Sequence, residues 1–175
     1  MTIGLSSQLI VPITLWGKQP PTHCISCVYL TPDCRTLITG CNDGQICLWD
    51  FAPLQNSFHL LPKYMLFGHT SAVLCLSHAS LSVECTLFVS SSESGEMCVW
   101  EVSDGRCLES IKLQNVHTNI EVYHMAINDE ARLLCTGFYS EIMIMNPVTL
   151  ETLFTLTSRV NPDWISAAHV IKHKQ

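Results

Sequence analysis

The chain has 175 residues, which is enough for one ordinary domain. Hydrophobic residues make up 47% of it and charged residues only 14%, so the chain can bury a core, and the composition excludes a disordered tail. The formal net charge is −6 and the nine Lys and Arg residues form no basic run, which argues against nucleic acid or an anionic membrane surface as the main partner.

The N-terminal stretch 1–17 (MTIGLSSQLIVPITLWG) is apolar, but it is not a signal peptide. It lacks a basic leading region, and Pro12 interrupts a short apolar run. No stretch reaches the roughly 20 apolar residues that a membrane-spanning helix requires. We therefore expect a cytoplasmic or peripheral protein whose ten cysteines remain reduced.

Apolar runs divided by turn residues predict strands along the whole chain. Residues 9–16 form the first predicted strand, and residues 164–171 form the last. Between them lie three groups of four strands, and a long exposed loop is expected at 51–63. The predicted strands of these groups are 24–30, 36–41, 45–50 and 63–67; 72–78, 86–91, 96–101 and 107–113; and 119–127, 132–137, 141–145 and 151–157.

The groups repeat one another. LITGCNDGQICLWD (37–50) aligns with FVSSSESGEMCVWE (88–101), which places Trp49 on Trp100 and Gly44 on Gly95. A fainter copy, RLLCTGFYSEIMIMN (132–146), carries Met145 in place of the tryptophan. A period of about 45 to 50 residues with Trp-Asp ends is typical of the four-stranded blade of a β-propeller.

We therefore predict an all-β, incomplete WD-repeat β-propeller of about three blades and the first strand of a fourth. The predicted parts are blade one at 24–67, blade two at 72–113, a degenerate blade three at 119–157 and the start of blade four at 164–171. The strand at 9–16 is expected to close the ring against a last blade, an arrangement that removes sheet edges.

The second repeat supplies three polar side chains that a blade can bury together: His69, Ser90 and Trp100. In such a blade a histidine before the first strand, a Ser or Thr on the second, a tryptophan on the third and an acid in the turn satisfy one another by hydrogen bonds. Ser94 stands where the acid is expected, so this network is incomplete.

The first repeat offers Thr39, Asp43 and Trp49 for the same network. Its histidine is missing, because Pro21 and not His23 aligns with the position of the histidine in the second repeat. We interpret both sets of residues as structural and not catalytic.

The pair Cys24 and Cys27 has the Cys-x-x-Cys spacing of redox and zinc sites. On an extended strand, however, residues i and i+3 face opposite ways, so the two thiols can neither bridge nor chelate easily. Cysteines also recur at equivalent positions of the first two repeats, as small buried hydrophobic residues would. No phosphate-binding glycine loop, nucleophile elbow or His-Glu-x-x-His motif is present. We expect no catalytic residue, cofactor or metal.

Five segments resemble the rabconnectin-3 beta chain family of large WD-repeat proteins, and they cover nearly the whole chain in the family's order. LWGKQPPTHCIS (15–26) and ESGEMCVWEVSDGRC (93–107) are the most specific of them. The others are DGQICLWD (43–50), LFGHTSAVLCLS (66–77) and NPDWIS (161–166). Members of this family are much longer, with two propellers separated by a long helical and partly disordered region. This chain resembles their amino-terminal propeller.

The resemblance implies a non-catalytic protein-interaction scaffold. Its implied partners are the rabconnectin-3 alpha chain and subunits of the vacuolar proton pump (V-ATPase), and its implied role is in pump assembly and vesicle acidification. The implied location is cytoplasmic, peripheral on synaptic vesicles or endosomes. Two alternatives remain open: a WD-repeat adaptor of another kind, such as a ubiquitin-ligase substrate receptor or a trafficking adaptor, and a thiol or zinc enzyme that uses the cysteines.

Overall fold

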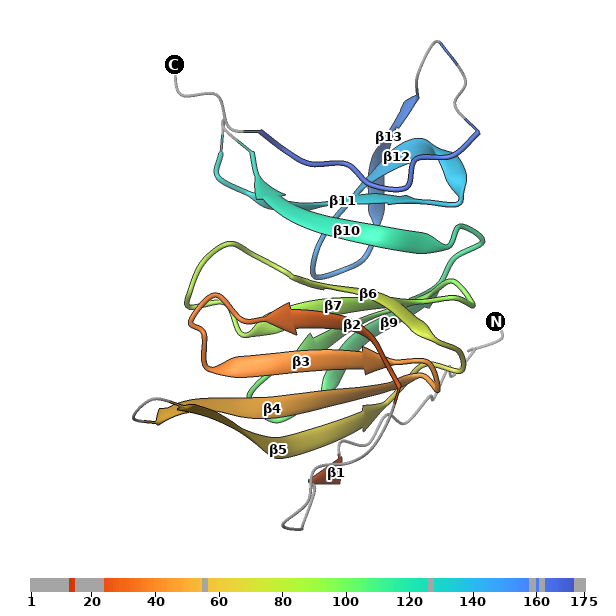
Figure 1. Cartoon of the computed structure of the whole chain (residues 1–175). Coiled ribbons are helices and arrows are strands. Elements are labelled where there is room, and N and C mark those ends of the chain that lie inside the picture. Colours follow the sequence, from red (N-terminus) through yellow and green to blue (C-terminus); the bar gives the residue numbers. More distant parts are fainter. Residues whose placement is uncertain are drawn as a thin grey trace, which may run out of the picture.

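The computed structural model describes residues 13–14, 24–54, 57–125, 128–157, 160 and 163–171. These residues form three antiparallel β-sheets and no helix, and none of them belongs to a helix that could cross a membrane (Figure 1). The expected all-β class is confirmed.

In each sheet four successive strands pair as a meander, and in the first sheet β1 adds to the outer edge of β5. The first has the order β1-β5-β4-β3-β2, the second β6-β7-β8-β9 and the third β10-β11-β12-β13. The strands are β1 Ile13–Thr14, β2 Ile25–Leu30, β3 Thr36–Cys41, β4 Gln45–Leu54, β5 Ser57–Phe67, β6 Val73–His78, β7 Leu87–Ser92, β8 Glu96–Glu101, β9 Cys107–Lys112, β10 His117–His124, β11 Ala131–Gly137, β12 Tyr139–Met145 and β13 Thr152–Thr157.

Glycines form the tight turns between the second and third strands of the first two sheets. Gly44 and Gly95 have φ angles of 85° and 80°, in the left-handed region that glycine adopts without strain. A Cβ at Gly44 would lie 2.5 Å from the His69 carbonyl oxygen. The two turns therefore need glycine for both backbone conformation and space, which explains why the sequence repeat keeps it.

The sheets stack face to face, and their first strands, β2, β6 and β10, follow one another (Figure 1). Two buried clusters fill the spaces between them. The cluster between the first and second sheets includes Ile38, Ile46, Leu48, Leu66, Leu76, Phe88, Cys98 and Trp100. The cluster between the second and third sheets includes Val89, Met97, Val99, Ile120, Val122, Leu133, Cys135, Met143 and Met145. Both faces of the inner strands of the second sheet, β6 to β8, are thus buried, whereas the outer strand β9 is largely exposed.

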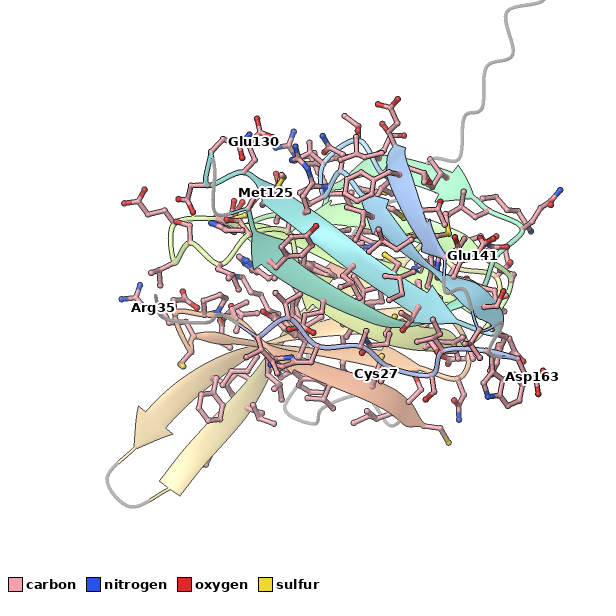
Figure 2. The ribbon with its side chains drawn as sticks, turned by 90° about the horizontal axis from the view of Figure 1, so that it is seen from above. Cys27, Arg35, Met125, Glu130, Glu141 and Asp163 are labelled. Carbon is pink, nitrogen blue, oxygen red and sulfur yellow. The ribbon has the colours of Figure 1, made fainter. Side chains whose placement is uncertain are left out.

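The prediction of an exposed loop at 51–63 is wrong. β4 continues to Leu54 and β5 begins at Ser57, and the two strands pair in register from Gln45↔Phe67 to Leu54↔Ser57. Strand β3 pairs with β4 only as far as Asp50. The end of this hairpin is therefore a two-stranded ribbon that projects from the sheet (Figure 2). Two facing strands satisfy each other's backbone hydrogen bonds, which a loop of this length would leave to water.

The ring-closing role expected for residues 9–16 stays a prediction, because the last blade that it requires is not among the described residues. Ile13 and Thr14 pair antiparallel with Met65 and Tyr64 of β5, at the outer edge of the first sheet. The remaining residues of this predicted strand lie outside the described residues. The outer edge of β5 offers unpaired backbone groups immediately beside the N-terminal segment, which accounts for the pairing.

Residues 163–171 run beside the third sheet, but the strand expected at 164–171 is not formed. A strand needs a continuous ladder with a neighbour, whereas this segment makes isolated hydrogen bonds, such as that from the Ile165 amide to the Tyr139 carbonyl.

Its position nevertheless continues the order of the first strands. The same type of contact joins each first strand to the next segment: Cys27 Sγ to the Val73 carbonyl at 3.7 Å, Cys75 Sγ to the His117 carbonyl at 3.6 Å, and Asn119 Nδ2 to the Ala168 carbonyl at 3.4 Å.

Candidate functional site

The second sheet contains a buried polar network centred on the Ser90 hydroxyl. Ser90 Oγ lies 2.6 Å from His69 Nε2 and accepts a hydrogen bond of 2.7 Å from Trp100 Nε1. All three side chains are buried. The structure therefore brings together the three residues that the sequence assigns to this network, and one hydroxyl satisfies two ring nitrogens that would otherwise be stranded away from water.

The acid beside this network is Glu96, which the sequence reasoning missed. Its carboxylate accepts hydrogen bonds of 2.9 Å from both the Thr70 amide and the Thr70 hydroxyl, and Glu96 Oε2 lies 3.8 Å from His69 Nδ1. Burial opposes ionisation of Glu96, but the Thr70 hydrogen bonds outweigh it and lower the pKa of the carboxyl. The signal in the sequence was a glutamate two residues beyond Ser94, the empty acid position, at the start of an otherwise apolar strand.

Burial lowers the pKa of His69 to about 4, although the nearby Glu96 carboxylate acts in the opposite direction. His69 is therefore neutral at physiological pH. Its ring joins the loop before β6 to the middle of β7 through the hydrogen bond with Ser90.

The first sheet repeats part of the network. Trp49 Nε1 donates a hydrogen bond of 2.9 Å to Thr39 Oγ1, and both residues are buried. Asp43 does not join them: its side chain is exposed and accepts a hydrogen bond of 3.2 Å from the Gln45 amide. An Asp in this turn stabilises the turn itself, because its carboxylate reaches the backbone two residues on. Pro21 and His23 lie outside the described residues.

The third sheet replaces the polar network with apolar side chains. Strand register places Met145 opposite Leu133, as Trp100 is opposite Phe88. Cys135 then takes the position of Ser90, and Leu113, four residues before β10, takes that of His69. Cys135 and Met145 are fully buried in the cluster that faces the second sheet, and Leu113 packs against it. The whole set changes together, because a half-satisfied buried network costs more stability than an apolar one.

The cysteines do not form the site that their spacing suggests. Cys24 is exposed ahead of β2, and Cys27 is half-buried within β2. Burial raises the pKa of Cys27 and raises that of Cys47 and of Cys75 to about 12, which keeps these thiols protonated. Among the described residues, no group of three or more His, Cys, Asp or Glu side chains could hold a metal ion.

The projecting hairpin is the surface feature that the packed sheets do not account for. At its base Lys63 Nζ lies 3.7 Å from Asp50 Oδ1, and the Phe51 amide donates to the Arg35 carbonyl at 2.7 Å. Beyond this point the ribbon has no third strand among the described residues. Leu61 pairs with Asp50 and Leu60 with Phe51 at this base, and the two leucines expose 57% and 43% of their surface. A two-stranded ribbon alone is only marginally stable in water, so exposed leucines at its base favour a partner that covers them.

Comparison with known protein families agrees with this geometry. Residues 15–50 and 61–101 match the family described as WD domain, G-beta repeat. WD repeat-containing protein 72 of Mus musculus and that of Homo sapiens are each 37% identical to the chain over 161 residues. Each match covers 91% of this chain and 14% of the relative, so the chain spans about one seventh of the length of these relatives.

Solved structures also share the fold. The crystal structure of the RRP9 WD40 repeats superimposes with a TM-score of 0.58 at 19% identity, and the match covers 86% of this chain and 43% of that one. These relatives do not support the rabconnectin-3 family in particular, but they establish the repeat and the fold. The chain contains repeats of the WD40 type, and its sheets have the fold of an open section of a WD40 β-propeller.

Proposed function

We propose that the chain acts as a non-catalytic scaffold that binds other proteins, and that the hairpin of β4 and β5 is a docking site. The carrying observation is that this hairpin projects from its sheet, and that Leu60 and Leu61 are exposed at its base. WD40 propellers are generally interaction scaffolds, which agrees with this reading.

The buried network of the second sheet supports a non-catalytic role. A catalytic serine needs a base that can accept its proton and a path for substrate. Here both Ser90 and Trp100 are fully buried, and the hydroxyl is occupied by the indole of Trp100. The network instead holds strands β7 and β8 and the loop before β6 in a fixed arrangement, as a rigid platform for docking requires.

We further propose partners of the rabconnectin-3 type: the rabconnectin-3 alpha chain and V-ATPase subunits, with the protein on the cytoplasmic side of vesicles or endosomes. The support for this part is the resemblance of segments such as LWGKQPPTHCIS (15–26) and ESGEMCVWEVSDGRC (93–107). The matches to WD repeat-containing protein 72 support a large WD-repeat protein and name no partner.

The proposal is tested by purification of the protein that carries this chain from cells, with and without the double substitution Leu60→Asp and Leu61→Asp. The matched control is Leu108→Asp, because Leu108 is also an exposed leucine of an outer strand, with 46% of its surface accessible. We expect the alpha chain and V-ATPase subunits to co-purify with the wild type and the control, and the hairpin variant to lose at least tenfold of them. If the hairpin variant and the control recover equal amounts of these partners, the hairpin is not the docking site. Recovery of ubiquitin-ligase adaptors without pump subunits would favour the other class of WD-repeat adaptor.

A further inference from the structure

Two thiols of the second sheet lie on adjacent strands and on the same face. Cys98 is in the middle of β8, and Cys107 begins β9. Cys107 is opposite Trp100, whereas Ser110 is opposite Cys98. Because Cys98 and Trp100 are two residues apart, they point to the same face, and Cys107 faces the same way as its cross-strand partner. The register also shifts between Val99 and Trp100, which brings this diagonal pair together.

The register makes the two thiols diagonal neighbours. Cys98 Sγ donates to Ser110 Oγ at 3.5 Å, and Cys107 Sγ donates to the Glu109 carbonyl at 3.2 Å. The neighbouring Cys98 side chain lowers the pKa of Cys107, although burial of Cys107 opposes it. The Cys107 side chain, together with burial, raises the pKa of Cys98. Cys98 is fully buried, whereas Cys107 is partly exposed. Cys107 is therefore a thiol that solvent can reach, with increased thiolate character, and it lies beside Cys98, a buried protonated thiol. Reactive cysteines that form disulfides have this arrangement.

The repeat does not account for Cys107. Cys98 has a counterpart in Cys47 of the first sheet, so packing alone could explain it. The position of Cys107 in the first sheet, opposite the equivalent tryptophan Trp49, is occupied by Pro62. The second thiol is therefore a feature of the second sheet and not of the repeated blade.

We propose that Cys98 and Cys107 form a reversible intramolecular disulfide when the protein meets a hydroperoxide. The Cys107 thiolate attacks one oxygen of hydrogen peroxide, and the O–O bond breaks. Hydroxide leaves, and Cys107 becomes a sulfenic acid. The Cys98 sulfur then attacks the Cys107 sulfur, the S–O bond breaks, and the Cys98 proton leaves with the oxygen as water. The two sulfurs together lose two electrons, and peroxide is reduced to two water molecules.

The disulfide would act on the face where the first two sheets meet. Cys98 belongs to the cluster that fills this space, and Cys107 and Tyr64 pack against it. Tyr64 also donates a hydrogen bond of 3.0 Å to the Ser103 carbonyl, in the turn between β8 and β9. A covalent link would tie the outer strand β9 to β8 beside Trp100 and restrict the outer edge of the second sheet.

The sequence permits a direct test by peptide mapping. Cleavage after glutamate and after lysine or arginine releases residues 97–101 (MCVWE) and 107–109 (CLE), each with one cysteine. The whole chain is treated with hydrogen peroxide, alkylated, and digested without reduction. We expect the two peptides to be recovered as one linked species, with two of the ten thiols lost and both regained after treatment with dithiothreitol.

Two substitutions complete the test. Cys107→Ser should abolish the linked species and the paired loss of thiols, whereas Cys34→Ser, at an exposed position, should leave both unchanged. Because Cys107 is only partly buried, the Cys107→Ser variant should have the same circular dichroism spectrum as the wild type. This spectrum is recorded first. Recovery of 107–109 as unlinked sulfinic or sulfonic acid, or linked to a different cysteine, would overturn the proposal.

Discussion

The substitution Ser90→Ala should destabilise the chain strongly for its size. The Ser90 hydroxyl is the shared partner of two buried ring nitrogens, His69 Nε2 at 2.6 Å and Trp100 Nε1 at 2.7 Å. Alanine removes this oxygen, so both ring nitrogens lose their hydrogen-bond partner while they remain buried away from water. The loss is therefore larger than that of a single exposed hydrogen bond.

Each stranded buried group costs about 1–3 kcal/mol, so the two together should cost about 2–6 kcal/mol of unfolding free energy. For a chain of this length 1 kcal/mol shifts the melting temperature by roughly 2–4 °C, which predicts a fall of roughly 4–24 °C. Thermal unfolding followed by circular dichroism measures it. In a double-mutant cycle with Trp100→Phe, the combined loss should be smaller than the sum of the single losses, because the second change removes one stranded donor.

The third sheet supplies a control of opposite sign. Thr136 is fully buried, and its hydroxyl has no hydrogen-bond partner in the part of the chain that the structure describes. Thr136→Val, which keeps the volume, should therefore be neutral or stabilising by up to about 1 kcal/mol. Ser103→Ala, at an exposed turn, should change stability by less than about 0.5 kcal/mol. If Ser90→Ala melts within 2 °C of the Ser103 variant, the reasoning about the buried network is refuted.

Three further predictions follow from the same contacts. Burial lowers the pKa of His69 and of His117 to about 4, below the unfolded value of 6.5, so the unfolded chain binds more protons than the folded chain between these two pH values. The free energy of unfolding should therefore fall as the pH drops from about 6.5 to 4. Denaturant titrations measure it, and a free energy that does not change with pH would contradict the prediction. Cys135→Ser should destabilise the chain by about 1–3 kcal/mol, because Leu113 and Met145 offer the buried hydroxyl no strong partner; unchanged stability in the same melts would be incompatible with an apolar third network. Gly95→Ala should cost more than about 1 kcal/mol, because a Cβ at φ 80° would collide with the Leu113 carbonyl; a chemical-denaturation midpoint equal to that of the wild type would show that the turn relaxes freely.

Much of the fold could be predicted from local sequence features, because the same glycine and tryptophan positions recur in the first two blades. Glycine is required where φ is positive, as at Gly44 and Gly95, and the buried Trp49 and Trp100 recur one blade apart. Strand order within each sheet then follows from short turns, which allow only neighbours in sequence to pair.

The parts that failed depended on contacts between distant segments. Residues 51–63 have two prolines and several polar residues that favour a loop, but the pairing of β4 with β5 outweighs this local preference. The role of Glu96 follows from the approach of Thr70 across 26 residues, which no local pattern encodes. The diagonal placement of Cys98 and Cys107 likewise depends on a register shift between Val99 and Trp100, which a strict alternation of strand residues does not predict.

The most direct test of the scaffold account is cross-linking of the intact protein to its partners, read at two lysines of this chain. Lys63 lies at the base of the projecting hairpin, and Lys112 is an exposed lysine at the end of β9 on another sheet. The account predicts that amine cross-links to a co-purified protein concentrate at Lys63 and disappear in the Leu60→Asp, Leu61→Asp variant. Cross-links that favour Lys112, or that persist at Lys63 in that variant, would contradict the hairpin as the docking site.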